Sequence, residues 1–167
     1  MAQKRPRAAA RTGRAADRTR VVLRGNALAT VDDSGRLKLP ASFRRQIAEA
    51  FGPQLFLTSV HGDAVLVYPL AVWEEREQRL LALSRQHPSV AKFLTRVSYH
   101  GAEATLDGKG RVVVPPVLRE SAQVVGEVAV LGQLDHLAVW NNAAFRRRLA
   151  AEPFTDDDQR ALAELGL

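Results

Sequence analysis

TVDDSGRLKLP at residues 30–40 and TLDGKGRVVVP at residues 105–115 are two copies of one short pattern. In each copy an Asp is followed three residues later by a Gly and four residues later by an Arg, with hydrophobic residues on both sides. Because glycine adopts positive φ at little cost, the pattern predicts a tight hairpin turn between two strands. The chain contains this turn twice.

The two turns lie within a longer internal repeat. Residues 29–44 (ATVDDSGRLKLPASFR) match residues 104–119 (ATLDGKGRVVVPPVLR) at seven of sixteen positions, and the last shared residue is an Arg. Each copy continues with a helical pattern that a glycine closes, at Gly52 and at Gly126. Two runs of strand-forming residues follow in each half. The predicted unit is therefore strand, turn, strand, short helix, strand, turn, strand, and it occurs twice.

The patterns outside the repeats are helical. Between the repeats, apolar residues recur at helical spacing, Pro88 interrupts the pattern, and a second amphipathic run follows. Near the end of the chain, Thr155 and Asp158 have the spacing of a capping box. We therefore predict an α+β fold with five parts: a tail (1–20), a first repeat (21–69), a helical connector (70–97), a second repeat (98–141) and C-terminal helices (142–167).

The positive charge of the chain is concentrated at its N-terminus. Residues 1–20 hold seven Lys or Arg and one Asp, which accounts for the whole formal net charge of +6 and leaves the rest of the chain neutral. This tail has almost no apolar residue larger than Ala to bury, so it is predicted to be disordered. A basic tail suits a polyanion such as DNA, and a contribution to solubility alone is the other interpretation.

The repeated turns are the best candidates for a functional site. An exposed Arg on a rigid turn suits a phosphate or a guanine edge, and an Asp four residues earlier could orient it. Two turns related by a pseudo-twofold axis suit the symmetry of a duplex. A polar turn with a solvated Arg is the alternative. The predicted DNA-contacting residues are Arg24, Arg36, Lys38, Lys109 and Arg111, and the predicted turn-orienting residues are Asp32, Gly35, Asp107 and Gly110.

Composition and the remaining motifs argue against other classes of protein. The absence of cysteine excludes disulfides and thiolate zinc sites and is typical of a reducing cytoplasm. No apolar run reaches the roughly 18 residues of a membrane span. No two of the four histidines have a metal-ligand spacing. We therefore expect no catalytic residue, metal, cofactor, membrane contact or small-molecule substrate. The neutral body leaves a protein-binding scaffold as the second interpretation.

Five stretches of the sequence together resemble the MraZ family: RGN (24–26), TVDDSGRLKLP (30–40), LVYPLAVWEE (66–75), LDGKGRVVVPP (106–116) and VLGQLDHLAVW (130–140). This bacterial family is encoded at the head of the division and cell-wall gene cluster and is built from two SpoVT-AbrB-type repeats. The resemblance implies a pseudo-twofold, swapped-hairpin (AbrB-type) β-barrel with helices. It also implies a ring-shaped homo-oligomer that binds double-stranded DNA through the Asp-x-x-x-Arg turns. We therefore expect a sequence-specific transcriptional repressor, cytoplasmic and associated with the nucleoid.

Overall fold

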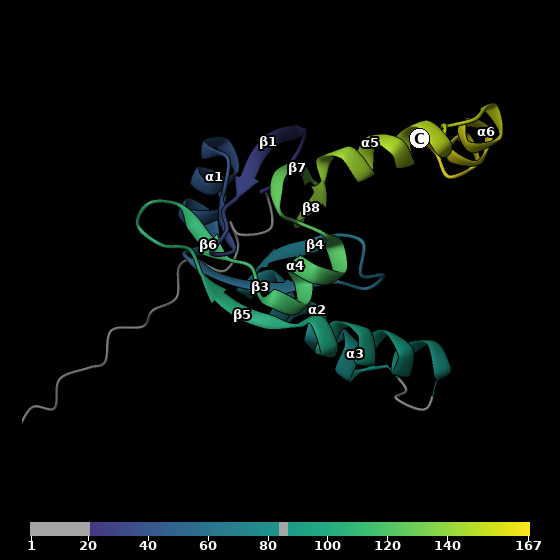
Figure 1. The fold of residues 1–167 in the computed structure, drawn as a ribbon. Helices are drawn as coiled ribbons and strands as arrows, with labels where there is room; N and C mark the ends of the chain where they lie inside the picture. The colour runs from purple at the N-terminus through teal and green to yellow at the C-terminus, as the bar shows by residue number, and fades with distance from the viewer. Residues whose placement is uncertain (1–20, 84–86) are drawn as a thin grey trace, which may run out of the picture.

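The first repeat folds in the predicted order. The computed structural model describes residues 21–83 and 87–167, and the predicted disordered tail, 1–20, lies outside them. Phe43 and Ile47 form the buried face of the helix, which Gly52 ends with a φ of 83°. The elements are β1 (Asn26–Val31), β2 (Arg36–Lys38), α1 (Ala41–Phe51), β3 (Gln54–Thr58) and β4 (Val65–Pro69), shown in Figure 1.

The second repeat has the same order of elements but a different helix end. The sequence pattern predicts that Gly126 closes the helix, and this is wrong: the helix ends at Ala122. Gln123 takes the left-handed conformation, and its amide donates to the carbonyl of Arg119, so the helix end is satisfied without glycine. Gly126 instead opens the next strand. The elements are β5 (Ala102–Thr105), β6 (Arg111–Val113), α4 (Pro116–Ala122), β7 (Gly126–Gly132) and β8 (Leu137–Asn141).

The eight strands form one antiparallel sheet that curves into a nearly closed barrel. Their order is β5-β3-β4-β8-β7-β1-β2-β6, and the end strands β5 and β6 also contact each other. The hairpins are exchanged between the repeats, because β1 pairs with β7 and β5 pairs with β3. Equivalent strands meet at the pseudo-twofold axis, where β2 pairs with β6 and β4 with β8. The predicted swapped-hairpin barrel is therefore confirmed.

Both repeats contribute to one apolar core inside the barrel. Leu37 of β2 faces Val112 of β6, and their side chains are 0% and 1% exposed. A smaller apolar cluster joins the sheet to the helices of the connector. There Trp73 stacks on Phe56 with ring centroids 4.4 Å apart and packs on Tyr68 at 5.1 Å. Because the main core cannot be divided between the repeats, the two repeats form one folding unit.

The connector forms two helices, α2 (Leu70–Leu81) and α3 (Pro88–His100). Pro88 occupies the start of α3, where a missing N–H costs no helical hydrogen bond. Because α3 ends at His100, residues 98–100, the predicted start of the second repeat, are helical. The C-terminal helices are α5 (Asn142–Ala151) and α6 (Asp156–Glu164), and the predicted capping box of Thr155 and Asp158 is present.

Helices α3, α5 and α6 extend away from the second turn (Figure 1). In Figure 1, α5 and α6 extend to the upper right and α3 to the lower right, whereas β6 and the loop before it lie at the left. Arg148 attaches α5 to the barrel, because its guanidinium pairs with Asp63 in the β3–β4 loop and lies over the ring of Trp140. Residues 107–109 of the second turn are exposed, so this turn is accessible.

Candidate nucleic-acid interface

The two repeated turns have the same backbone geometry. Gly35 has a φ of 77° and Gly110 a φ of 76°, the positive values that the sequence predicts. The amide of Gly35 donates to the carbonyl of Asp32 at 2.8 Å, and the amide of Gly110 donates to the carbonyl of Asp107 at 2.9 Å. Both are tight turns in which glycine avoids the steric cost of the left-handed region.

The two aspartates hold the backbone of their turns. Oδ1 of Asp32 accepts hydrogen bonds from the amides two and four residues later, both at 2.9 Å. Oδ1 of Asp107 accepts the equivalent bonds at 2.9 and 2.8 Å. The backbone N–H of Arg111 is the main reason that the pKa of Asp107 is lowered, because this bond favours the ionised carboxylate. Each carboxylate therefore fixes the backbone from which an arginine projects.

The two turn arginines differ in their side-chain partners. Nε of Arg111 donates to Oδ2 of Asp107 at 2.9 Å, and the two side chains are 37% and 40% exposed. In the part of the chain that the structure describes, no ion pair joins Arg36 to Asp32, and Arg36 is exposed. The predicted Asp–Arg pair is therefore present in the second turn only. The guanidinium of Arg36 is left available for a ligand.

Strands β2 and β6 bring the two turns close together. Leu37 faces Val112 across this pair, so the pseudo-twofold axis passes between them. From strand geometry, the Cα atoms of Arg36 and Arg111 lie about 8 Å apart. Leu37 and Val112 point inward, so the alternate residues point outward. The outer face of this two-stranded unit, called the β2–β6 ribbon below, carries Arg36, Lys38, Arg111 and Val113.

The other two predicted cations are placed differently. Lys109 is exposed within the second turn, directly before the β2–β6 ribbon. Arg24 precedes β1, and the first turn follows the far end of that six-residue strand. A strand of this length separates Arg24 from the first turn by about 20 Å. The structure therefore gathers Arg36, Lys38, Lys109 and Arg111, and it does not bring Arg24 to them.

Two arginines outside the predicted set contact the turns. Arg44 of α1 lies against the second turn, where its Nη1 donates to the carbonyl of Lys109 at 3.3 Å. Arg119 of α4 lies against Gly35 of the first turn, where a Cβ would be 2.7 Å from its guanidinium carbon. The helix of each repeat therefore supports the turn of the other. The shared Arg at the end of the repeat is the sequence signal that could have identified both residues.

The polar groups of the β7–β8 turn are joined to α2. Asp135 lies 2.7 Å from Nδ1 of His136 and 3.1 Å from Arg76, which links α2 to the β7–β8 turn. Burial raises the pKa of Asp135, but the hydrogen bonds from His136 and Arg76 outweigh it and the pKa is lowered. Within 21–83 and 87–167 no cluster of three His, Asp or Glu could hold a metal ion. None of the described helices has the length and apolar character of a membrane span.

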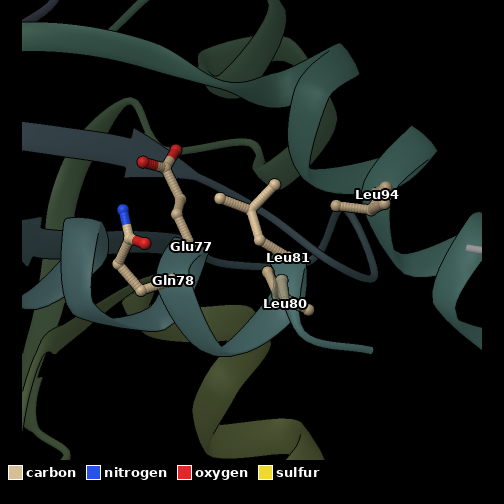
Figure 2. A pocket seen from close by; sticks show the side chains of 5 residues that line it. All are labelled: Glu77, Gln78, Leu80, Leu81 and Leu94. Atoms are coloured by element: carbon tan, nitrogen blue, oxygen red, sulfur yellow. The ribbon is translucent and has the colours of Figure 1, made fainter. Parts of the chain in front are cut away.

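An open groove lies between α2 and α3. It has a volume of about 310 Å³ and is lined by Glu77, Gln78, Leu80, Leu81 and Leu94, as Figure 2 shows. The carboxylate of Glu77 already accepts a hydrogen bond from Nε1 of Trp73 at 2.7 Å. Leu81 is 59% exposed. The groove therefore offers apolar contact and few polar groups to orient a small molecule.

Known proteins share both repeats with this chain. A family model described as "MraZ protein, putative antitoxin-like" matches residues 22–96 and 99–165. The "Transcriptional regulator MraZ" of Acidobacterium capsulatum is 47% identical over 146 residues, which cover 87% of this chain and 100% of that protein. The protein of the same name from Koribacter versatilis is 41% identical over 147 residues, with 87% and 100% covered. The one from Escherichia coli K12 is 32% identical over 145 residues, with 86% and 94% covered. Since the family model spans both repeats and the C-terminal helices, the chain belongs to the MraZ family.

Proposed function

We propose that this chain is a sequence-specific DNA-binding transcriptional regulator that contacts a duplex with the β2–β6 ribbon. The observation that carries the proposal is the outward placement of Arg36, Lys38 and Arg111 on two paired strands. The regulatory role is supported by the relatives named "Transcriptional regulator MraZ".

The β2–β6 ribbon suits the major groove of DNA. A two-stranded β-ribbon fits this groove, and an arginine can donate two hydrogen bonds to O6 and N7 of guanine. Arg111 is held by Asp107 at 2.9 Å, so it loses little conformational freedom when it binds. Lys38 and Lys109 are exposed beside it and can neutralise phosphates. The ribbon thus combines base reading with backbone contacts.

The target and the direction of regulation follow from the family resemblance. We propose that the chain represses transcription at the promoter of the division and cell-wall gene cluster, and therefore acts in the cytoplasm at the nucleoid. A protein that occupies the major groove across a promoter blocks polymerase access to the same DNA.

A binding titration tests the proposal. The wild type should bind the DNA upstream of its own gene more tightly than a scrambled duplex of equal length. Arg36→Ala should weaken specific binding by roughly ten- to a hundredfold, which corresponds to the removal of one bidentate bond to a base. Arg146→Ala, which removes an exposed cation of α5, is the matched control and should bind as the wild type does. Equal binding of both duplexes by the wild type contradicts the proposal.

A protein scaffold without DNA binding is the alternative function. It is supported by the neutral charge of residues 21–167, since dedicated DNA-binding domains are commonly basic. The two functions differ in their response to salt. Binding through phosphates weakens steeply as salt rises. A scaffold shows no DNA affinity at low salt.

We also propose that several copies of this chain form a closed homo-oligomer. Large apolar side chains are exposed on the connector and C-terminal segments: Leu81 (59%), Tyr99 (70%), Leu149 (57%) and Phe154 (65%). Contact with another copy removes this area from water. Trp73 of α2 is only 4% exposed and already packed, so it is not part of this surface. Several linked barrels raise the affinity for repeated short sites.

Light scattering tests the assembly. A mass near 18.3 kDa, that of a single chain, contradicts it. The double change Leu149→Glu and Phe154→Glu should lower the assembled mass, since it places charge on the exposed apolar surface. Leu28→Glu is the control, because Leu28 is equally exposed (61%) but lies on β1 of the barrel.

A further inference from the structure

We propose that Arg44 and Arg119 are positioning residues that hold each DNA-contacting turn from the opposite repeat. Through this support they set the spacing and direction of Arg36 and Arg111. The effect on DNA rests on the proposed function of the turns, whereas the structural part rests on geometry alone. Three observations carry the inference, two on the arginine side chains and one on the backbone of the turns.

The first contact is between an arginine and a turn glycine. A Cβ at Gly35 would lie 2.7 Å from both Nε and Cζ of Arg119, which is closer than atoms approach. A Cβ at Gly110 would likewise collide with the side chain of Arg44. In each turn the arginine therefore fills the space next to the glycine Cα. Each turn is therefore packed on the side that faces the helix of the other repeat.

The second contact concerns the polar atoms of the two arginines. Among the described residues, Nε of Arg119 is buried without a hydrogen-bond partner. A buried donor without a partner is unfavourable, so hydrogen bonding by Nε does not explain the placement of this side chain. Its van der Waals contact with the first turn does. Arg44 donates a hydrogen bond to the carbonyl of Lys109 at 3.3 Å, so the second turn is held by van der Waals contact and by a hydrogen bond.

The third contact is made by the backbone on the other side of each glycine. The amide of Val114 donates to the carbonyl of Gly35 at 2.8 Å, and the amide of Leu39 donates to the carbonyl of Gly110 at 3.0 Å. Each turn is therefore hydrogen-bonded to the residue that follows a strand of the other repeat and packed against a helix arginine of the other repeat. The two turns are fixed relative to one another across the pseudo-twofold axis.

The support of the turns affects DNA binding because each arginine proposed to contact DNA directly follows a turn glycine. Arg36 comes after Gly35, and Arg111 comes after Gly110. A shift of either turn moves one arginine relative to the other. A misplacement of about 1 Å is enough to weaken a pre-organised contact strongly. Loss of either positioning arginine should therefore reduce specific binding, although neither needs to touch DNA.

Hydrogen exchange tests the structural part without DNA. In Arg119→Ala the turn amides at 34–36 should exchange roughly tenfold faster, while those at 109–111 stay as in the wild type, because local opening is confined to the unsupported turn. Arg44→Ala should give the reverse pattern. Arg45→Ala removes the neighbouring exposed cation of α1 and should change neither turn. If Arg119→Ala fails to fold, Arg119→Met keeps the aliphatic stem but lacks the guanidinium that packs on Gly35, so it should show a smaller acceleration that is still confined to the first turn. Equal acceleration in both turns, or none, overturns the proposal.

Binding titrations test the functional part. Arg119→Ala should weaken specific binding roughly tenfold but leave the slope of log affinity against log salt unchanged, since the protein still neutralises the same number of phosphates. Since Arg119 supports only the first turn, the double variant Arg36→Ala/Arg119→Ala should bind as weakly as Arg36→Ala alone. The double variant Arg111→Ala/Arg119→Ala should instead show the losses of both single variants combined. A reduced salt slope overturns the proposal by making Arg119 a phosphate-binding residue. If the wild type binds no DNA but the exchange pattern is reciprocal, the positioning role stands and the proposed function fails.

Discussion

Lys38 and Arg111 face each other directly across the β2–β6 ribbon. Two like charges at opposed positions destabilise an antiparallel pair. At the symmetry-related position, Arg36 faces Val113, and no such repulsion arises. The pairing of Arg111 with Asp107 offsets part of this repulsion in the free barrel, and a phosphate bound at Lys38 would offset the rest.

Replacement of Lys38 by Val, the residue at the equivalent position 113 of the second repeat, should raise the stability of the fold and lower its affinity for DNA. Lys38→Val removes the repulsion and restores a β-branched side chain, so the free energy of unfolding should rise by about 0.5–1 kcal/mol. The same change should weaken DNA binding and reduce the salt slope by about 0.9, the value for one neutralised phosphate. Urea unfolding and binding titrations measure the two effects. Lys92→Ala, an exposed lysine of α3, should leave the salt slope unchanged.

Alanine at three glycines should separate backbone strain from the contact with Arg119. Gly108 lacks a positive φ and has open space, so Gly108→Ala should be nearly neutral. Gly25 has a φ of 84° and open space, so Gly25→Ala should cost about 1–2 kcal/mol from strain alone. Gly35→Ala should cost more, because the new Cβ also displaces Arg119. A cost for Gly35→Ala no larger than that for Gly25→Ala in urea unfolding contradicts the packing of Arg119 on the turn.

The carboxyl of Asp107 should titrate below its ordinary pKa of 3.8 in the folded protein. A lowered folded pKa means that its stabilising effect is complete above the unfolded pKa and is lost as pH falls through the folded pKa. NMR titration of the side-chain carboxyl measures this pKa. The main cause is the backbone N–H of Arg111, so in Arg111→Ala the pKa of Asp107 should stay below 3.8 but by less. A return to 3.8 in that variant would assign the shift to the guanidinium instead.

Deletion of residues 1–20 should weaken binding to specific and scrambled duplexes by similar factors. This segment holds the whole net charge of +6, and bonds to phosphates carry no base information directly. The salt slope should fall by about 0.9 for each phosphate that the tail neutralises in the full-length chain. Titrations of both duplexes over a range of salt measure this effect. An unchanged slope would mean that the tail does not touch DNA.

Local features of the fold could be predicted because they depend on nearby residues. The glycine turns, the capping box at Thr155 and the end of α1 at Gly52 are all set by residues within one or two turns of chain. The end of α4 was predicted wrongly because tertiary pairing decides it. Gly126 pairs with Val31 at the end of the β1–β7 ladder, so the strand must already have begun there.

The residues that form the candidate nucleic-acid interface could be predicted only in part from the sequence. The spacing in the repeat identifies the turns, but the strand exchange decides which residues meet. Arg24 is close to β1 in sequence yet lies at the far end of that strand from the first turn. Arg44 and Arg119 reach the turns of the opposite repeat, about 65 and 84 residues away in the chain. Sequence periodicity reflects only neighbouring residues, so it could not predict contacts between residues this far apart.

The exchange of hairpins also has a consequence during synthesis on the ribosome. β1 pairs with β7, which lies roughly a hundred residues later in the chain. At a translation rate of about 5–20 residues per second, β1 waits on the order of 5–20 s for this partner. Throughout that interval its hydrogen-bonding edge is open, and the nearest equivalent strands belong to other nascent chains on the same messenger RNA. The exchange of hairpins therefore exposes one edge of β1 to pairing with another nascent chain until β7 has been made.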